Sequence, residues 1–338
     1  MNTTDDSTDG ASSTAQGISR RQALLKLLRL GALGAGVSAV SAWLSGRSHH
    51  PVEAVVTNAK RSHTVAPDAS FPDVVIVEGG EPAQLVQAAL RELGGISRFV
   101  SRNDVVLVKP NIGWDRTPEQ AANTNPELVA EVVRQCLSVG ARKVIVTDVS
   151  CNDARRCFQR SGIAQAARNA GAQVLLPDPA QFKDVDLEGE VLRTWQIFEP
   201  FLSADKIINI PIAKHHSLSG ATLGMKNWFG ILGGMRNQLH QRIHESLVDL
   251  ADFVRPSLTV VDCYRVLVRN GPTGGSLEDV ALHKTLVAGT DPVAIDAYVA
   301  KRYWNLDVDA MPYLKLASQR GLGSYEFDKV KSKFVTLS

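Results

Sequence analysis

The stretch 205–230 combines side chains that bind anions, transfer protons and ligate metals. It begins with an apolar run typical of a buried strand, 207–212. The chemically active side chains follow that run, in the order Lys214, His215, His216, Lys226 and Asn227. Charged side chains are rarely buried without partners, so a strand that delivers them together predicts a functional loop. A solvated loop after the strand is the alternative.

Polar side chains also follow other apolar runs of the sequence. They are Lys109 and Asn111 after 105–108, Asp148 after 144–146, Asp262 at the end of 258–262, and Asp291 after 285–288. Ligands collect at the carboxyl ends of parallel strands, so we expect these side chains to outline one cleft. Two of them have a structural alternative, because Asp148 and Asp291 are also suited to cap the helix that follows each of them.

Two kinds of chemistry suit such a cleft. Lysine side chains and the N–H groups of Gly-rich turns bind carboxylates and phosphates. The expected ligand-binding residues are Lys109, Asn111, Lys214, Lys226 and Asn227. Imidazole and carboxylate groups transfer protons, and the expected catalytic residues are His215, His216, His240 and Asp148.

The same residue types could instead hold a divalent metal. His240 and His244 are four residues apart on an expected helix, 238–253, so we expect both to face one side of it. The spacing suits a metal pair, although the glutamate of the metalloprotease motif H-E-x-x-H is missing. Asp262, Asp291 and His244 are the expected metal ligands, and an exposed helix face is the alternative for the two histidines.

The elements that must position these residues alternate along the chain. The expected strands are 74–77, 105–108, 144–146, 174–176, 207–212, 258–262 and 285–288, with one further antiparallel strand at 191–198. The expected helices are 82–93, 126–137, 153–170, 238–253 and 292–303. Uninterrupted apolar strands separated by amphipathic helices predict an α/β fold with a mostly parallel, mixed sheet and helices on both faces.

The first 70 residues differ in composition from the rest. Arg20 and Arg21 precede a moderately apolar, Gly-rich run, and small residues around Ala42 suit cleavage, so 1–42 is expected to be a twin-arginine signal peptide. An uncleaved anchor is the alternative, and without it no stable membrane span is expected. Residues 43–70 are expected to be a linker, and 71–338 a single α/β domain. This leader predicts export by the twin-arginine machinery to the periplasm or cell envelope.

Charge and cysteine usage narrow the functional classes. Of 37 Lys and Arg and 35 Asp and Glu, four and three lie in 1–42, so the remaining chain has an excess of one positive charge. This balance does not favour binding to nucleic acid. The four cysteines form no C-x-x-C pair, so we expect no iron–sulfur cluster. Cys151 and Cys157 could pair or stay free.

Short motifs follow one another along the chain, among them Lys109-Pro110-Asn111, Lys226-Asn227-Trp228-Phe229-Gly230 and Asp291-Pro292-Val293-Ala294-Ile295-Asp296. Together they resemble the bacterial and archaeal domain-of-unknown-function family 362, and the last two are the most specific parts of the resemblance. The similarity extends over about 105–299 and implies a single α/β domain with a shared site, without naming a reaction. Some relatives carry an added ferredoxin module, from which this chain departs because its cysteines are not clustered.

Taken together, these patterns predict an exported enzyme acting on a small carboxylate or phosphate, with or without help from a divalent metal. The alternative is a cell-envelope protein that carries a ligand or cofactor in the same cleft without turnover.

Overall fold

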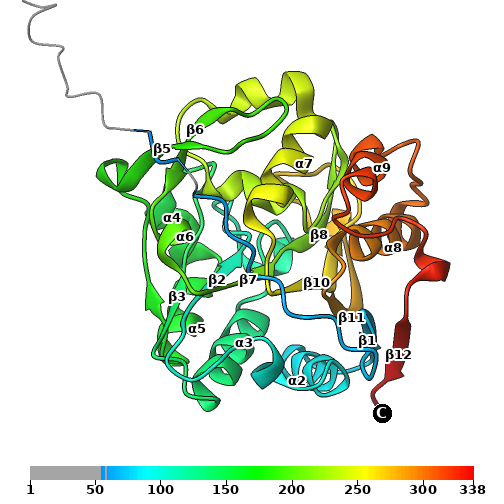
Figure 1. Cartoon of the computed structure of the whole chain (residues 1–338). Helices are drawn as coiled ribbons and strands as arrows, with labels where there is room; N and C mark the ends of the chain where they lie inside the picture. Colours follow the sequence, from blue (N-terminus) through cyan, green and yellow to red (C-terminus); the bar gives the residue numbers. More distant parts are fainter. Residues whose placement is uncertain (1–54, 58) are drawn as a thin grey trace, which may run out of the picture. The chain divides into compact units, whose positions relative to one another are not determined.

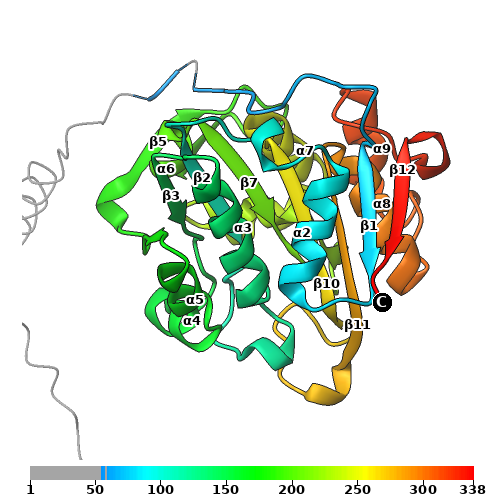
Figure 2. The same ribbon diagram turned by 90° about the horizontal axis from the view of Figure 1, so that it is seen from below.

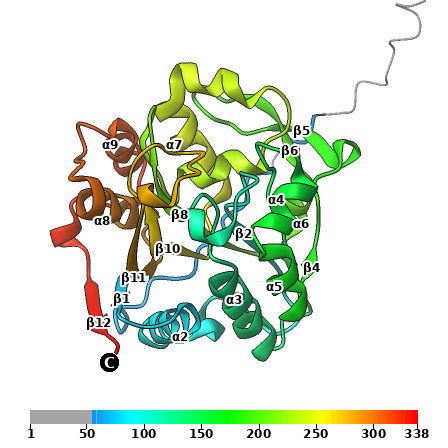
Figure 3. The same cartoon turned by 180° about the vertical axis from the view of Figure 1, so that it is seen from behind.

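One ten-stranded sheet organises the computed structural model, which describes residues 55–57 and 59–338 (Figure 1). Eight strands lie side by side in the order β12-β1-β11-β10-β7-β2-β3-β4. Their bounds are β1 Val74–Glu78, β2 Val105–Pro110, β3 Lys143–Val146, β4 Gln173–Val174, β7 Lys206–Ile210, β10 Leu258–Leu267, β11 Val280–Gly289 and β12 Ser332–Thr336. β4 and β12 form the two edges of this series (Figure 3). The two remaining strands, β8 (Ile212–His216) and β9 (Gly220–Thr222), branch from β10.

The sheet is mixed and mostly parallel. β10, β7, β2, β3 and β4 run parallel to one another, and β1 runs parallel to β12. In the described series of eight, β11 alone runs against both of its neighbours. The predicted fold class is therefore confirmed, and its exception, β11, decides where one of the candidate residues lies.

Helices cover both faces of the sheet (Figures 1 and 2). One face carries α2 (Pro82–Glu92), α3 (Pro126–Ser138), α4 (Ala154–Arg160) and α5 (Ile163–Asn169). The other carries α6 (Pro200–Ser203), α7 (Ile243–Val254), α8 (Pro292–Trp304) and α9 (Pro312–Gln319). Alternate side chains of one strand enter opposite cores: Val74 and Ile76 pack under the second group of helices, and Val75 and Val77 under the first. Burial on both faces explains the unbroken apolar strand runs.

Three expected elements are interrupted. The helix expected at 153–170 is split into α4 and α5 by Gly162, whose φ of +73° does not continue a right-handed helix. The strand expected at 207–212 ends at Ile210, and Pro211, which has no N–H to donate, separates it from β8. The helix expected at 238–253 begins as a 3₁₀ helix, Arg236–Arg242, and becomes α-helical only in α7.

The antiparallel strand expected at 191–198 forms as β6 (Thr194–Phe198). It pairs with β5 (Phe182–Asp186), which the sequence pattern did not indicate, and the two form a separate sheet. Nothing in Phe-Lys-Asp-Val-Asp alternates strongly enough to mark β5 as a strand.

The stretch expected to be a linker belongs in part to the folded unit, which begins at Ala54. Val56 exchanges backbone hydrogen bonds with Asp184 and Asp186, and Lys60 forms an ion pair of 2.6 Å with Asp252. The backbone N–H of His63 donates to Arg255 and its ring contacts the carbonyl of Asp205. Composition does not indicate these contacts, because they use backbone groups and scattered polar side chains rather than large apolar ones.

The expected signal peptide, 1–42, lies outside the described residues. Within the part of the chain that the structure describes, no helix is long and apolar enough to cross a membrane.

Candidate functional site

A pocket of about 510 Å³ opens beyond the carboxyl ends of β2 and β3 and beside β8. Eight of the residues singled out in the sequence line it: Lys109, Asn111, Asp148, Lys214, His216, Lys226, Asn227 and His240. We call this hollow the lysine pocket. The five expected ligand-binding residues are all in its wall, so most of the expected set lies around one hollow.

Strand β8 places two of these side chains in the pocket wall, and a third candidate residue of the same strand faces away from the pocket. Lys214 and His216 are two residues apart on the strand, so they share one face and both line the pocket. His215 lies between them and does not line it. Its Nδ1 instead accepts a hydrogen bond of 3.2 Å from the backbone N–H of Gly271. The three residues were expected in a loop, where no such alternation would apply.

β9 holds β8 in this extended form. Lys214 pairs with Thr222 and His216 with Gly220 in an antiparallel ladder. The hydroxyl of Thr222 is buried in the pocket wall and has no hydrogen-bond partner in the described structure.

Lys109 and Asp148 form a buried ion pair at the floor of the pocket. Their side chains are 0% and 3% exposed, and Nζ of Lys109 lies 2.6 Å from Oδ1 of Asp148. Lys109 also donates to the carbonyl of Pro110 and to Oδ1 of Asn227, so all three of its N–H groups have acceptors. The second oxygen of Asp148 accepts from the backbone N–H of Ile112 at 2.6 Å. These two residues are therefore occupied by each other and by the backbone, not free for a ligand.

Gly230 makes room for this pair. A Cβ at that position would lie 1.9 Å from Oδ1 of Asp148 and 2.6 Å from Nζ of Lys109. Any other residue would collide with the ion pair, which explains the glycine at the end of Lys226-Asn227-Trp228-Phe229-Gly230.

Asparagine side chains connect the pocket wall in a buried hydrogen-bond network. Oδ1 of Asn227 accepts from Lys109 and from Nδ2 of Asn111, and its Nδ2 donates to Oδ1 of Asn209 at 2.8 Å. Oδ1 of Asn111 in turn accepts from Lys214 at 3.0 Å. Asn209, which lies inside β7, was missed because its run reads as purely apolar strand. Such a network orients its members and holds the wall rigid.

Within the described part of the chain, Lys214 has no carboxylate partner. It is 1% exposed, and Nζ donates to Oδ1 of Asn111 and to the carbonyl of Ala122 at 2.6 Å. Burial lowers the pKa of Lys214 to about 7, with the neighbouring lysines adding to the effect.

Lys226 is still less engaged. It is 6% exposed and has no hydrogen bond in the described structure. Its contact is with the ring of Phe229, whose centroid lies 4.2 Å from Nζ. Burial lowers the pKa of Lys226 to about 8.

Two histidines present different ring nitrogens to the pocket. Nδ1 of His216 accepts from the backbone N–H of Leu218 at 3.1 Å, so the neutral ring carries its proton on Nε2. Nδ1 of His240 lies 3.2 Å from the carbonyl of Asn237 and donates to it, which leaves the lone pair on Nε2. The rings are stacked with centroids 6.3 Å apart.

Both histidines stay neutral at physiological pH. Burial first, and the charge of Lys226 second, lower the pKa of His216 to about 3. The same two causes lower the pKa of His240. The pocket thus holds one imidazole that donates a hydrogen bond and one that accepts a proton.

Further wall residues were missed in the sequence. Arg236 points its guanidinium at the carbonyls of Val149, Ser150 and Phe229, at 2.7–3.1 Å, and adds a fourth cation to the pocket. Lys109, Lys214, Lys226 and Arg236 therefore face a single carboxylate, Asp148, among the residues that line this pocket. Arg236 follows the turn Gly233-Gly234 and belongs to no sequence motif. Only the folded structure therefore shows that it lines the pocket.

The expected metal ligands are not brought together. β10 continues to Leu267, so Asp262 lies inside the strand, where its carboxylate accepts from the backbone N–H groups of Asn125 and Tyr264. Burial raises the pKa of Asp262 to about 6. Asp291 caps α8 by accepting from the N–H groups of Val293 and Ala294.

The direction of β11 explains the position of Asp291. Gly289, at the end of β11, pairs with Thr259 at the start of β10, so Asp291 lies at the edge opposite to the pocket. His244 is in α7 and stacks on Tyr313, because the change from 3₁₀ to α helix at Ile243 removes the shared face expected with His240. Among residues 55–57 and 59–338, no three His, Cys, Asp or Glu are grouped so that they could hold a metal ion.

Asp296, the second aspartate of the motif 291–296, supports the pocket from outside. Its fully buried carboxylate accepts from the backbone N–H groups of Gly224 and Met225, directly before Lys226. The hydroxyl of Tyr313 approaches the same carboxylate at 3.3 Å. The motif therefore connects α8 to the segment that carries Lys226 and Asn227.

All four cysteines have free thiols. Cys157 is buried, and Cys151 is exposed and lines the lysine pocket.

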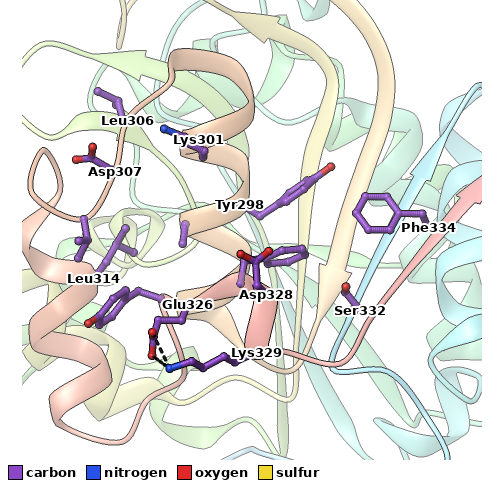
Figure 4. Close-up of a pocket in the computed structure, with 14 residues that line it drawn as sticks. Tyr298, Lys301, Leu306, Asp307, Leu314, Glu326, Asp328, Lys329, Ser332 and Phe334 are labelled. Carbon is purple, nitrogen blue, oxygen red and sulfur yellow. Dashed lines mark hydrogen bonds and ion pairs between the residues drawn. The ribbon is translucent and has the colours of Figure 1, made fainter.

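A second hollow, of about 800 Å³, lies between α8, α9 and the C-terminal segment (Figure 4). Its wall is mainly apolar and includes Tyr298 and Phe334. Its charged residues are partly paired, as Lys329 is with Glu326. It contains none of the residues singled out for chemistry, so it is larger but is not the candidate site.

The chain is similar in sequence to a known protein family. The sequence profile described as "Domain of unknown function (DUF362)" matches residues 106–301, more than half of the chain. A thylakoid-associated protein of Synechocystis is 27% identical over 254 residues, which cover 73% of this chain and 76% of that protein.

Two solved structures resemble the fold more distantly. The lactate racemase apoprotein from Thermoanaerobacterium thermosaccharolyticum is 12% identical, with a TM-score of 0.36 over 65% of this chain. A protein from Thermotoga maritima is 12% identical, with a TM-score of 0.39 over 72% of this chain. The match spans only 55% and 60% of those two proteins.

Proposed function

This chain belongs to the DUF362 family, whose function is unknown, and we propose that in this member the lysine pocket binds a small carboxylate or phosphate and catalyses proton transfer on it. The protein would then be an enzyme whose ligand is an anion small enough for a space of about 510 Å³.

The observation that carries this proposal is the state of Lys226. The Lys226 residue is only 6% exposed, and among the described residues its Nζ has neither a hydrogen-bond acceptor nor an ion-pair partner, so this largely buried charge lacks the compensation that burial requires. An anionic ligand would supply the missing acceptor. The other cations support the same conclusion, because Asp148 is the single carboxylate of this wall and is already bonded to Lys109 and Ile112.

The histidines supply the catalytic part of the proposal. A general base needs an accessible lone pair, and Nε2 of His240 has one. A hydrogen-bond donor directed at developing negative charge stabilises it, and Nε2–H of His216 fits that role. Lys214 and Lys226 would hold the anion between these two groups.

Two further parts of the proposal rest on the sequence. Arg20 and Arg21 support export of the folded protein to the cell envelope by the twin-arginine route. A divalent metal could join the bound anion, with His240 as one ligand from the protein. Metal analysis of the purified chain tests this second part.

The test is a binding titration of the full chain with oxalate and with inorganic phosphate, by calorimetry. We expect one anion per chain, and a loss of affinity of at least tenfold in Lys226→Gln. Lys315→Gln is the matched control, since Lys315 is an exposed lysine of α9 outside the pocket. Equal affinities in all three proteins would overturn the proposal.

The fate of the molecule that the protein binds distinguishes an enzyme from a carrier. Mass spectrometry of molecules freed on denaturation identifies the natural anion, which is then incubated with fresh protein. Conversion that is lost in His240→Ala supports catalysis. Return of the unchanged anion would make the protein a carrier and would refute the catalytic half of the proposal.

A further inference from the structure

We propose that Lys226 is a nucleophile that condenses with the carbonyl group of a small oxo-carboxylate, so that the anion of the lysine pocket is held covalently as an imine. This inference rests on the proposed function, because it names the chemical class of the anion bound in the same pocket. It also gives Lys226 a role beyond that of a positive charge.

Three lysines line the pocket, and their hydrogen bonds separate their roles. Nζ of Lys109 has three acceptors, one of them the carboxylate of Asp148, so it is a fixed ammonium group. Nζ of Lys214 has two neutral acceptors in the wall, Asn111 and Ala122. Lys226 has no acceptor among residues 55–57 and 59–338, so its amine is the one of the three that is available to react.

The surroundings of Lys226 favour the neutral amine, which is the nucleophilic form. The residue is only 6% exposed, and removal from water disfavours the charged ammonium form. The lowered pKa of Lys226, about 8, leaves a sizeable neutral fraction near neutral pH. A free lysine has little of that form at the same pH.

A proton carrier lies beside this amine. The ring of His240 meets the ring of Phe229 edge-on with centroids 5.6 Å apart, and the same Phe229 ring contacts Nζ of Lys226. Nε2 of His240 carries a lone pair, because its Nδ1 donates to Asn237. The base and the amine therefore share one side of the pocket.

The reaction is a condensation with no change in oxidation state. The lone pair of Nζ forms a bond to the carbonyl carbon, and the electrons of the C=O π bond move to oxygen. His240 takes one proton from the nitrogen and passes it to the alkoxide oxygen, which becomes a hydroxyl group, and then passes the second amine proton to that hydroxyl group. The C–O bond then breaks, and the carbonyl oxygen leaves as water with both amine hydrogens. Nε2–H of His216 would hydrogen-bond the oxygen as its charge develops.

The remaining cations define the rest of the substrate. Lys214 and Arg236 stay in the wall after Lys226 has reacted, so the molecule must carry a negative group beside its carbonyl. A carboxylate adjacent to the carbonyl also makes the carbonyl carbon more reactive toward amines. An oxo-acid with its carboxylate next to the carbonyl meets both conditions.

The experiment traps the imine by reduction. The full chain is incubated with glyoxylate or pyruvate and sodium borohydride, and digested peptides are analysed by mass spectrometry. We expect one carboxymethyl or carboxyethyl group per chain, on Lys226. Cys151→Ser should give the same adduct, because a thiol adduct of the aldehyde is not fixed by borohydride.

Lys226→Arg separates this inference from the proposed function. Arginine keeps the positive charge but forms no imine, so this variant should still bind oxalate within about tenfold of the original chain and should yield no adduct. Lys315→Arg should react like the original chain. An adduct spread over surface lysines, or oxalate binding with no adduct at Lys226, would overturn the inference, and the second of these results would leave anion binding intact.

Discussion

At the scale of single residues, hydrogen bonds rather than residue types distinguish the members of the lysine pocket. Lys109 and Lys226 are both buried lysines, yet one has three acceptors and the other has none. His216 and His240 are both neutral imidazoles, yet the neighbouring backbone leaves a proton on Nε2 of the first and a lone pair on Nε2 of the second. Their different chemistry is set by partners that are distant in sequence.

The lowered pKa values predict how anion binding depends on pH. Lys214, with a pKa of about 7, and Lys226, at about 8, attract an anion only when protonated. Affinity should therefore be highest below pH 7 and should fall as the pH rises through 7 and 8. Beyond pH 8 each required proton lowers affinity by about tenfold per pH unit. Calorimetry with oxalate measures this pH dependence of the affinity, because the charge of oxalate itself is constant in this pH range.

The Lys226→Arg variant is the control for that profile, because a guanidinium stays protonated. Its affinity should fall less steeply above pH 8 than that of the original chain. Identical profiles, or affinity that rises with pH, would contradict the assignment of these two amines to the anion.

At the scale of elements, strand β8 is the part that sorts the cluster Lys214-His215-His216. The break at Pro211 starts a new strand, and pairing with β9 extends it through His216. Alternation then sends Lys214 and His216 into the pocket and His215 out of it.

Neighbouring histidines of β8 should therefore behave differently. His216→Ala removes a pocket donor and should weaken oxalate binding by about three- to tenfold, the value of one hydrogen bond. His215→Ala removes an acceptor for Gly271 outside the pocket and should leave the affinity within about twofold. Titration of both variants with oxalate measures the two affinities, and circular dichroism verifies that the variants fold. A larger loss of affinity in His215→Ala than in His216→Ala would mean that β8 is not extended as described.

Helix α8 also acts on the pocket at a distance. Asp296 holds the backbone of Gly224 and Met225, so Asp296→Ala should cost about 2–3 kcal/mol of stability and should also weaken anion binding by roughly tenfold. Urea unfolding and oxalate titration measure the two effects.

Asp249→Ala is the matched control for Asp296. Asp249 is as deeply buried and accepts from the N–H groups of Glu190, Val191 and Leu192 and from the guanidinium of Arg320, away from the pocket wall. We expect a loss of stability at least as large, with unchanged affinity. Equal losses of affinity in both variants would show that the effect is general loosening, not support of Lys226.

At the scale of the whole molecule, the direction of the strands decides which polar ends meet. β2, β3 and β7 run parallel and bring their following residues to one edge. β11 runs the other way, which separates Asp291 from that edge. A strand followed by a polar residue and a helix has the same sequence pattern whether the strand runs parallel or antiparallel to its neighbours. The local sequence therefore does not show which direction the strand takes.

The proposed export also concerns the whole molecule. Changing both Arg20 and Arg21 to lysine should retain the protein in the cytoplasm, because the twin-arginine route depends on that pair. Arg29→Lys, in the same leader, should be exported normally. Fractionation of cells expressing each form, followed by immunoblotting, measures it, and export of the double variant would refute the route.

The sequence by itself determined the regular elements that bury an apolar face, and which polar residues follow them. Apolar runs and helix periodicity predicted β1, β2, β3, α2, α3 and α8 closely, because these elements are stabilised by burying a regular apolar face. The same runs located the polar residues that follow β2 and β3, and the motif that carries Lys226 and Asn227.

The tertiary structure decided what depends on partners far along the chain. It set the direction of β11, the extension of β10 past Asp262, and the turn from 3₁₀ to α helix that separates His240 from His244. It also placed Arg236 in the pocket and left Lys226 without an acceptor. Strand pairing and hydrogen-bond satisfaction are properties of the assembled sheet, so no local window of residues contains them.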